Sequence, residues 1–235
     1  MNKYFKYTGR FVFKAARFCT LPLLDVLYPA FCLICENPLQ NNTLICPQCQ
    51  HSLDQAVLPR DHLKTNPVSV PEPQFDAAIA ALSYTRSVQT LIHNFKYNGY
   101  SRLSKIFAGY MTDQIKTNNL QFDSLQPVPL HSGRKRERGF NQAESLCKSL
   151  SKQFNVPLLD CLIRHRYTSQ QAKYHREKRF QNVKNAFKLK QSVRVNHIAL
   201  VDDVITTGAT VNECSRLLKE SGAREITVLT ICRIE

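Results

Sequence analysis

The stretch HIALVDDVITTGAT, residues 197–210, decides the fold and the site of this chain. Its apolar start, His197–Val201, is predicted to form a strand that ends in two carboxylates, Asp202 and Asp203. A short loop then carries hydroxyl groups and one glycine, and a helix follows. Because an open sheet of parallel strands binds ligands outside the carboxyl ends of its strands, the stretch predicts a ligand site at this loop.

The chemistry of this loop suits a phosphate beside a sugar. Gly208 lets the backbone approach closely, and the free N–H groups of the following helix favour an anion. Hydroxyls from Thr206, Thr207 and Thr210 add donors, while the two carboxylates can accept hydrogen bonds from vicinal sugar hydroxyls. A ribose 5-phosphate unit satisfies both halves of the site. The alternative is that the acids and threonines only cap a helix. Neither G-x4-G-K-[ST] nor G-x-G-x-x-G occurs in the chain.

The C-terminal two thirds of the chain alternate short apolar runs with amphipathic segments. Fully apolar strands that alternate with helices are typical of a parallel sheet covered on both faces, so we expect an α/β domain over residues 75–235. The expected strands are 76–84, 125–129, 197–201 and 226–232, and the expected helices are 88–97, 103–116, 140–154 and 210–221.

Four of the nine cysteines form two knuckles with the spacing C-x2-C-x10-C-x2-C. Two residues between cysteines let both thiolates reach one ion, and two such knuckles complete a tetrahedron, so a structural zinc site is predicted. A redox or disulfide function is the alternative, but the length of the chain disfavours a disulfide scaffold, and a reducing, cytoplasmic compartment is expected. The predicted metal ligands are Cys32, Cys35, Cys46 and Cys49.

Composition and segment boundaries give the domain order. The 235 residues are 43% hydrophobic, which excludes a disordered chain, and no run of about 18 apolar residues occurs. Residues 1–30 form a basic amphipathic segment that either lies on an acidic membrane surface or packs beside the cysteine module. Residues 31–54 are the cysteine module, and residues 55–74 contain four prolines and read as a linker.

The net charge of +14 is concentrated in one block. Residues 131–194 carry sixteen basic and four acidic side chains, a surplus of +12, and such a block indicates a polyanionic partner. Between residues 164 and 194, aromatic side chains interleave with the basic ones, a pattern typical of binding to single-stranded nucleic acid. The candidates for DNA binding are Arg164, Arg166, Lys173, Tyr174, Arg176, Lys178 and Arg179.

Several motifs together resemble one family. LVDDVITTGAT is similar to the binding motif for phosphoribosyl pyrophosphate (PRPP) of type I phosphoribosyltransferases. Together with this motif, the cysteine knuckles and several further segments occur in the order of the ComF family of competence-associated proteins, also called DNA utilisation proteins. The resemblance covers roughly residues 28–235. The further segments are FKYNG (95–99), PVPLHSGRKRERGFNQAE (127–144), TSQQ (168–171) and REKRFQNVKNAF (176–187).

The resemblance implies a zinc module joined to a type I phosphoribosyltransferase-like domain that binds PRPP with Mg²⁺. Asp202 and Asp203 match the acids that hold the ribose hydroxyls, and the phosphate loop comprises Thr206, Thr207, Gly208, Ala209 and Thr210. In some base-salvage relatives an acid stands at the position of Thr206 and accepts a proton from the base, so this candidate general base is absent, as it also is in orotate-type members.

The segment that follows Pro129 is similar in position to the pyrophosphate loop of that fold. Gly133 and Gly139 permit turns, and guanidinium groups between them suit phosphate because they bind it in a bidentate manner. A basic surface turn is the alternative. The candidates for pyrophosphate binding are His131, Arg134, Lys135 and Arg138.

Three functions of different class remain open. The first is a protein that handles incoming single-stranded DNA in natural transformation and binds PRPP with little or no turnover. The second is an active phosphoribosyltransferase that acts on a nucleobase or a related acceptor. The third is a module in which PRPP regulates the binding of DNA or of a partner. The resemblance also leaves open contact with the DNA-uptake machinery at the inner membrane face, with the chain located in the cytoplasm or peripherally at that membrane.

Overall fold

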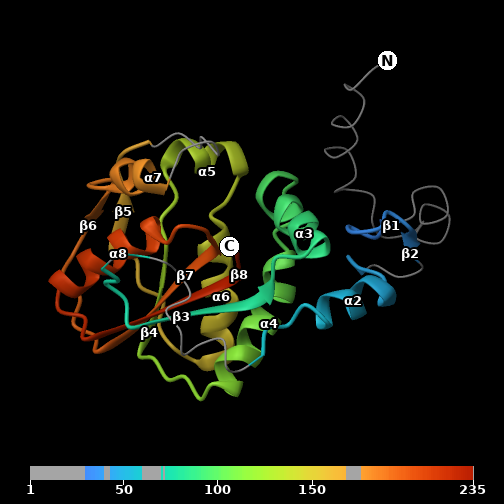
Figure 1. The fold of residues 1–235 in the computed structure, drawn as a ribbon, viewed down its shortest axis with the longest axis horizontal. Helices are drawn as coiled ribbons and strands as arrows, with labels where there is room; N and C mark the ends of the chain where they lie inside the picture. Colours follow the sequence, from blue (N-terminus) through green and yellow to red (C-terminus); the bar gives the residue numbers. More distant parts are fainter. Residues whose placement is uncertain (1–29, 40–42, 60–69, 71, 168–175, 235) are drawn as a thin grey trace, which may run out of the picture. The chain divides into compact units, whose positions relative to one another are not determined.

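The structure, a computed structural model, describes residues 30–39, 43–59, 70, 72–167 and 176–234 (Figure 1). The chain divides into two compact units between Gln50 and His51. The predicted basic segment 1–29 and most of the proline-rich linker lie outside the described residues. In the part that is described, no helix combines the length and the apolar character needed to cross a membrane.

The first unit is built around the cysteine knuckles. Two short antiparallel strands, β1 (Ala30–Phe31) and β2 (Pro38–Leu39), flank the first knuckle. Helix α2 (Pro47–Asp54) begins directly after Cys46 and continues into the second unit. Proline is favoured at the first position of a helix because the missing N–H has no intrahelical acceptor there. Pro47 therefore starts a helix inside the second knuckle.

The second unit is built on a four-stranded parallel sheet in the order β3-β8-β7-β4 (Figure 1). This arrangement confirms the predicted α/β class. Its strands are β3 (Ala77–Ser83), β4 (Ser124–Pro127), β7 (His197–Ile205) and β8 (Glu225–Arg233). Short extended segments continue the sheet at both edges: Leu58 N–H donates to Ala81 O beside β3, and Leu159 N–H donates to Leu125 O beside β4. The first residues of the predicted linker thus lie along the sheet.

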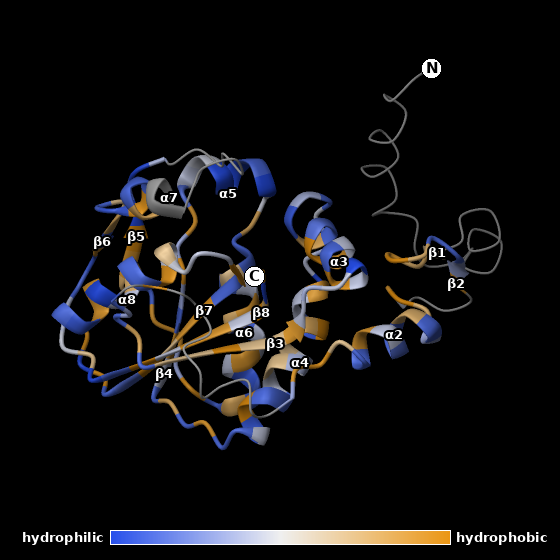
Figure 2. Ribbon diagram, in the orientation of Figure 1, coloured by the Kyte–Doolittle hydropathy of each residue, from blue (hydrophilic) through white to orange (hydrophobic). Residues whose placement is uncertain are grey.

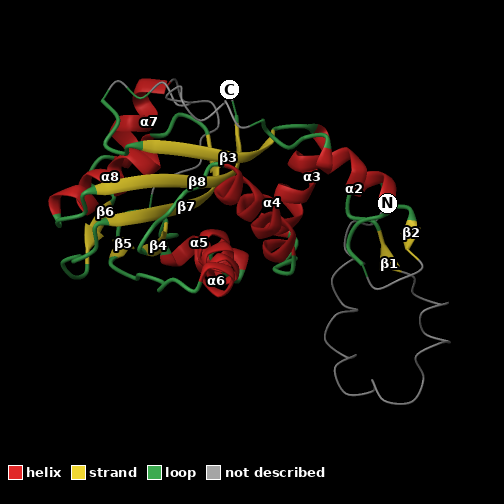
Figure 3. Cartoon of the chain, turned by 90° about the horizontal axis from the view of Figure 1, so that it is seen from below, coloured by secondary structure: helices red, strands yellow, loops and turns green. Residues whose placement is uncertain are grey.

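Helices cover both faces of the sheet (Figure 3). Helices α4 (Leu103–Thr117) and α6 (Gln142–Phe154) pack against each other and against the strands on one face, while α8 (Ala209–Glu220) covers the other. Alternate strand residues serve the two layers: Ile198 and Leu200 of β7 join the core beneath α8, whereas Ala199 and Val201 are buried outside that core. Figure 2 shows the resulting pattern, with apolar strands inside and polar outer helices.

The remaining elements are short or lie beside the sheet. They are α3 (Arg86–Tyr97), α5 (Ser132–Arg138), α7 (Arg176–Val183) and the antiparallel pair of β5 (Leu162–Arg164) and β6 (Phe187–Leu189). Among them, α7 and β6 contact α8. Helix α3 carries its buried face at helical spacing, since Val88, Leu91, Ile92 and Phe95 are all buried.

Two local expectations differ from the structure. The sequence places the end of the central strand at Val201, but β7 continues to Ile205 because its pairing with β8 persists through Val204 and Ile205. The basic segment after His131 forms helix α5 rather than a looped turn. The His131 side chain caps this helix by accepting a hydrogen bond from the N–H of Gly133, and Gly139, at φ +82°, ends it in the left-handed conformation.

Candidate functional site

The carboxyl ends of all four parallel strands open into one cavity of about 350 Å³ within the second unit. Tyr84 follows β3, Val128 follows β4, and Ile234 follows β8, while β7 contributes both of its carboxylates. This is the edge at which an open α/β sheet binds ligands. The cavity is therefore the candidate ligand site that the sequence places after β7.

The two carboxylates of β7 occupy different environments. Asp203 is 9% exposed, and one of its oxygens lies 2.9 Å from the Nζ of Lys96 on α3. Burial lowers the pKa of Lys96, but the charge and hydrogen bond of Asp203 outweigh this and leave the pKa raised. Lys96 is thus held as a cation that orients Asp203.

Asp202 is half-buried and accepts a hydrogen bond of 2.8 Å from the N–H of Asp203. Burial, followed by the negative charge of Asp203, raises its pKa to about 7, although Lys96 and Arg164 oppose this rise. Asp202 is therefore a carboxyl group that changes its charge near neutral pH.

The loop after β7 leads into α8 through a glycine. Gly208 adopts φ +74°, a conformation that side chains disfavour, and directs the chain from the strand into α8. The first regular hydrogen bond of α8 runs from Asn212 N–H to Gly208 O, so the preceding N–H groups have no acceptor within the helix. Of the predicted loop residues, Thr206 and Thr210 line the cavity, and Thr207, Gly208 and Ala209 connect them.

Helix α5 contributes cations to the lining of the cavity. Arg134 and Arg138 line the cavity. Arg138 donates to Gln142 Oε1 at 3.1 Å, and its guanidinium carbon lies 5.1 Å from the centroid of the Tyr97 ring. Two of the four candidates for pyrophosphate binding thus line the cavity, and both belong to α5.

The other two candidates on this segment have structural contacts. His131 caps α5, as described above. Lys135 lies 3.1 Å from Glu144, which also pairs with Lys148 at 2.6 Å. Lys135 lines a second cavity, of about 300 Å³, that shares the Pro129–Leu130 segment with the first.

The candidates for DNA binding are divided among three places. Arg164 lines the main cavity, and its guanidinium carbon lies 5.1 Å from the centroid of the Phe187 ring. Arg166 donates to the carbonyl oxygens of Asn182 at 2.9 Å and Lys184 at 2.7 Å, and so joins the end of β5 to the end of α7. Lys173 and Tyr174 lie outside the described residues. The backbone of Arg176, Lys178 and Arg179 belongs to α7.

Several cavity residues were not predicted from the sequence. Asn141 caps α6 and donates to Val128 O at 3.1 Å, and the buried Gln142 donates to Phe95 O at 3.3 Å. These amides hold α3, α5 and the end of β4 together. The sequence signal that could have identified these two amides was their position in GFNQAE, directly after the arginine-rich segment. Lys96, which was also not predicted, lies in the segment FKYNG.

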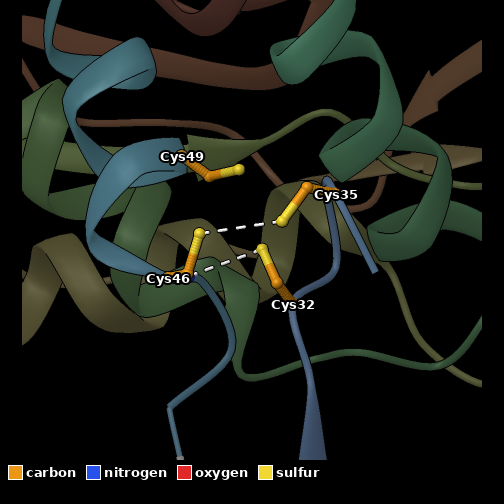
Figure 4. A group of neighbouring side chains, drawn as sticks. All are labelled: Cys32, Cys35, Cys46 and Cys49. Carbon is orange, nitrogen blue, oxygen red and sulfur yellow. Dashed lines mark hydrogen bonds between the residues drawn. The ribbon is translucent and has the colours of Figure 1, made fainter. Parts of the chain in front are cut away.

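The four predicted metal ligands converge in the first unit (Figure 4). All four Sγ atoms lie within 4.8 Å of one another, and those of Cys35 and Cys46 are 3.7 Å apart. Four thiolates at about 2.3 Å from a tetrahedral Zn²⁺ would stand about 3.8 Å apart, so the donor set and its spacing fit this ion. Burial raises the pKa of Cys32, but backbone N–H groups of Cys35, Cys46 and Ile34 outweigh it and lower the pKa to about 6.

Comparison with known proteins gives two findings. Residues 141–234 match the phosphoribosyl transferase domain family. Over 221 residues the chain is 30% identical to DNA utilization protein YhgH of Escherichia coli K12, an alignment that covers 92% of this chain and 95% of that protein. It is 34% identical over 171 residues to competence protein F of Haemophilus influenzae, covering 69% of this chain and 75% of that protein. Against competence protein ComFC of Streptococcus pneumoniae the identity is 29%, covering 66% and 67%.

Proposed function

The chain belongs to the ComF family of competence and DNA utilization proteins, and on that premise we propose that it binds PRPP with Mg²⁺ while it handles single-stranded DNA. The observation that carries the PRPP proposal is a single cavity whose lining combines adjacent carboxylates, hydroxyl groups and guanidinium groups. Asp202, Asp203, Thr206 and Thr210 line it from β7 and the start of α8, and Arg134 and Arg138 line it from α5.

Each part of PRPP has a partner of suitable chemistry. The 5-phosphate accepts hydrogen bonds from the loop N–H groups and from Thr206 and Thr210. The ribose hydroxyls donate to the two carboxylates, of which Asp203 is already oriented by Lys96. The pyrophosphate meets the guanidinium groups of α5, which bind phosphate oxygens in pairs. Mg²⁺, when bound, would neutralise pyrophosphate oxygens and keep several water ligands.

A melting experiment with three ligands tests this assignment. Because selective binding to the folded state stabilises it, PRPP with Mg²⁺ is expected to raise the melting temperature. Ribose 5-phosphate tests the groups of β7 and of the loop before α8, and pyrophosphate with Mg²⁺ tests the arginines of α5. Asp202→Asn is expected to abolish the ribose 5-phosphate effect and Arg138→Gln the pyrophosphate effect. Glu220→Gln, at the far end of α8, is the control.

The outcomes of this experiment are distinct. If none of the three ligands changes the melting temperature of the wild-type chain, the proposed PRPP site is wrong. If each variant affects both partial ligands equally, the assignment of ribose 5-phosphate to β7 and its loop and of pyrophosphate to α5 is wrong.

The same cavity supports a second candidate function, phosphoribosyl transfer to an acceptor. Beyond the phosphate-binding groups, α3 adds Gln89, His93 and Tyr97 to the lining, which can contact a planar acceptor. In transfer, the bond from the anomeric carbon to pyrophosphate breaks as the bond to the acceptor forms. Release of pyrophosphate from labelled PRPP in the presence of nucleobases or DNA tests it, and no release with any acceptor would exclude transfer to the acceptors tried.

We further propose that the cysteine cluster holds a structural zinc ion. All four coordination positions would be filled by thiolates, which leaves no open position for catalysis. The thiolates of Cys46 and Cys49 lie at the amino end of α2, where the helix dipole favours negative charge. Elemental analysis of the purified, reduced chain should give about one zinc per chain, and zinc should be lost in Cys46→Ser. A zinc-free, folded preparation would contradict the proposal.

A further inference from the structure

Two of the candidates for pyrophosphate binding, His131 and Arg134, contact one exposed tyrosine. Tyr167, just beyond β5, is 56% exposed. Its ring lies 5.1 Å from the His131 ring, edge to face, and 5.6 Å from the guanidinium carbon of Arg134. A Cβ atom placed on Gly133 would stand 3.6 Å from the same ring, so α5 approaches the tyrosine closely. Tyr167 is therefore an exposed aromatic ring beside α5, whose Arg134 lines the cavity.

Three guanidinium groups gather in that cavity. Arg164 comes from β5, while Arg134 and Arg138 come from α5. Burial, followed by the like charge of Arg134, lowers the pKa of Arg164, although Cys214 and Asp202 oppose this. The three guanidinium groups form a cationic part of the lining, and this suits a ligand that carries several phosphates. Both PRPP and a nucleic-acid backbone are such ligands.

We propose that Arg134 and Arg164 of the cavity and the neighbouring Tyr167 form a shared mouth, in which a nucleotide of single-stranded DNA stacks its base on Tyr167 and places a phosphate between Arg134 and Arg164, so that PRPP and DNA exclude each other. The inference rests on the proposed PRPP site. It assigns Tyr167 to DNA alone, because the ring offers a stacking face and no charge. It assigns Arg134 and Arg164 to both ligands.

Mutual exclusion has a quantitative consequence. If both ligands require the same guanidinium groups, the apparent Kd for DNA rises in proportion to the PRPP concentration, and DNA weakens PRPP binding by the same factor. The proportionality constant must equal the PRPP affinity measured without DNA. Independent sites would leave the DNA Kd unchanged, and an arrangement in which PRPP orders the site for DNA would lower it.

The test is a titration of the full chain with a fluorescent single-stranded oligothymidine at increasing PRPP, with Mg²⁺ constant. Ionic strength is held equal with NaCl, because nucleic-acid affinity itself falls with salt. We expect the DNA Kd to rise at least tenfold when PRPP reaches ten times its own Kd. A DNA Kd that stays constant or falls would overturn the inference.

Variants separate the two roles. Tyr167→Ala should weaken DNA binding by about tenfold and leave the PRPP-induced rise in melting temperature unchanged, and Tyr167→Phe should restore DNA binding. Arg164→Gln should weaken both ligands, whereas Arg224→Gln, at the amino end of β8, should weaken neither. Unchanged DNA binding in Tyr167→Ala would contradict the stacking role.

Failure of this inference can be distinguished from failure of the proposed function. If PRPP raises the melting temperature but does not displace DNA, the PRPP site stands and the shared mouth is wrong. If PRPP produces no rise in melting temperature, the proposed function fails first, and the inference fails with it.

Discussion

At the scale of single residues, the site depends on two adjacent carboxyl groups that lie in different environments. Asp203 is paired with Lys96, and Asp202 has a pKa raised to about 7 by burial and by the charge of its neighbour. The sequence predicted both acids because they follow an apolar strand. It could not predict their pairing, since Lys96 lies on a helix far away in the chain and only the fold brings it within 2.9 Å.

The raised pKa of Asp202 predicts a pH dependence. A carboxyl group whose pKa is higher in the folded state contributes stability that is complete below its ordinary value of 3.8 and is lost as the pH rises to about 7. Without ligand, the melting temperature should therefore fall between about pH 4 and pH 7, and Asp202→Asn should reduce that fall. Ligand-free melting curves of both proteins across this range check it, and parallel pH profiles would show that Asp202 does not titrate there.

The pairing of Lys96 with Asp203 predicts a coupling energy. Lys96→Met leaves a mostly buried carboxylate without its cation, which should reduce the free energy of unfolding by about 3 kcal/mol. Because Asp203→Asn removes the charge that Lys96 balances, the double variant should lose less than the sum of the two single variants. Chemical denaturation of the four proteins measures this difference, and additive losses would mean that the pair contributes nothing.

At the scale of elements, the long segments were predictable and the short ones were not. Helices α3, α4, α6 and α8 and strands β3 and β8 lie within a few residues of their predicted positions, because each carries a clear apolar periodicity. The strands β5 and β6 have three residues each, too few for a periodic signal. Helix α5 contains no buried residue and depends on its cap at His131, which the sequence pattern does not reveal.

The turn of the first knuckle predicts a stabilising substitution. Glu36 follows Cys35 and adopts φ +60°, a conformation that costs a side chain about 1–2 kcal/mol and glycine almost nothing. Glu36→Gly should therefore slow the release of zinc to a chelator, since the knuckle is less strained. Glu36→Gln removes the charge but keeps the side chain, so it should release zinc like the wild type. Equal release rates for all three proteins would show that this strain does not limit the knuckle.

At the scale of the whole molecule, the charge distribution and the fold point to polyanionic ligands. The surplus of +12 between residues 131 and 194 spans α5, β5, α7 and β6, and part of it lines the cavity through Arg134, Arg138 and Arg164. The sequence located this charge but not its division between the cavity and the outer surface. That division depends on the tertiary placement of β5 and α5, which brings Arg164, Arg134 and Arg138 to one cavity.

The basic residues of α7 predict a salt effect on DNA binding. Single-stranded DNA should bind with little sequence preference, and its affinity should fall steeply with salt because counterions are released. Charge reversal at Arg176, Lys178 and Arg179 should weaken binding to all sequences alike and flatten the dependence on salt. Binding titrations at several salt concentrations measure both effects. An affinity that does not respond to salt would exclude these three residues from DNA binding.

A crystal structure of the chain with PRPP and Mg²⁺ would show whether this one cavity holds the whole of PRPP. We predict that the 5-phosphate lies on the Thr206–Thr210 loop, that the ribose hydroxyls contact Asp202 and Asp203, and that the pyrophosphate faces Arg134 and Arg138. Density for PRPP outside this cavity would contradict the proposed site. So would density with the 5-phosphate at Arg134 and Arg138 and the pyrophosphate at the Thr206–Thr210 loop.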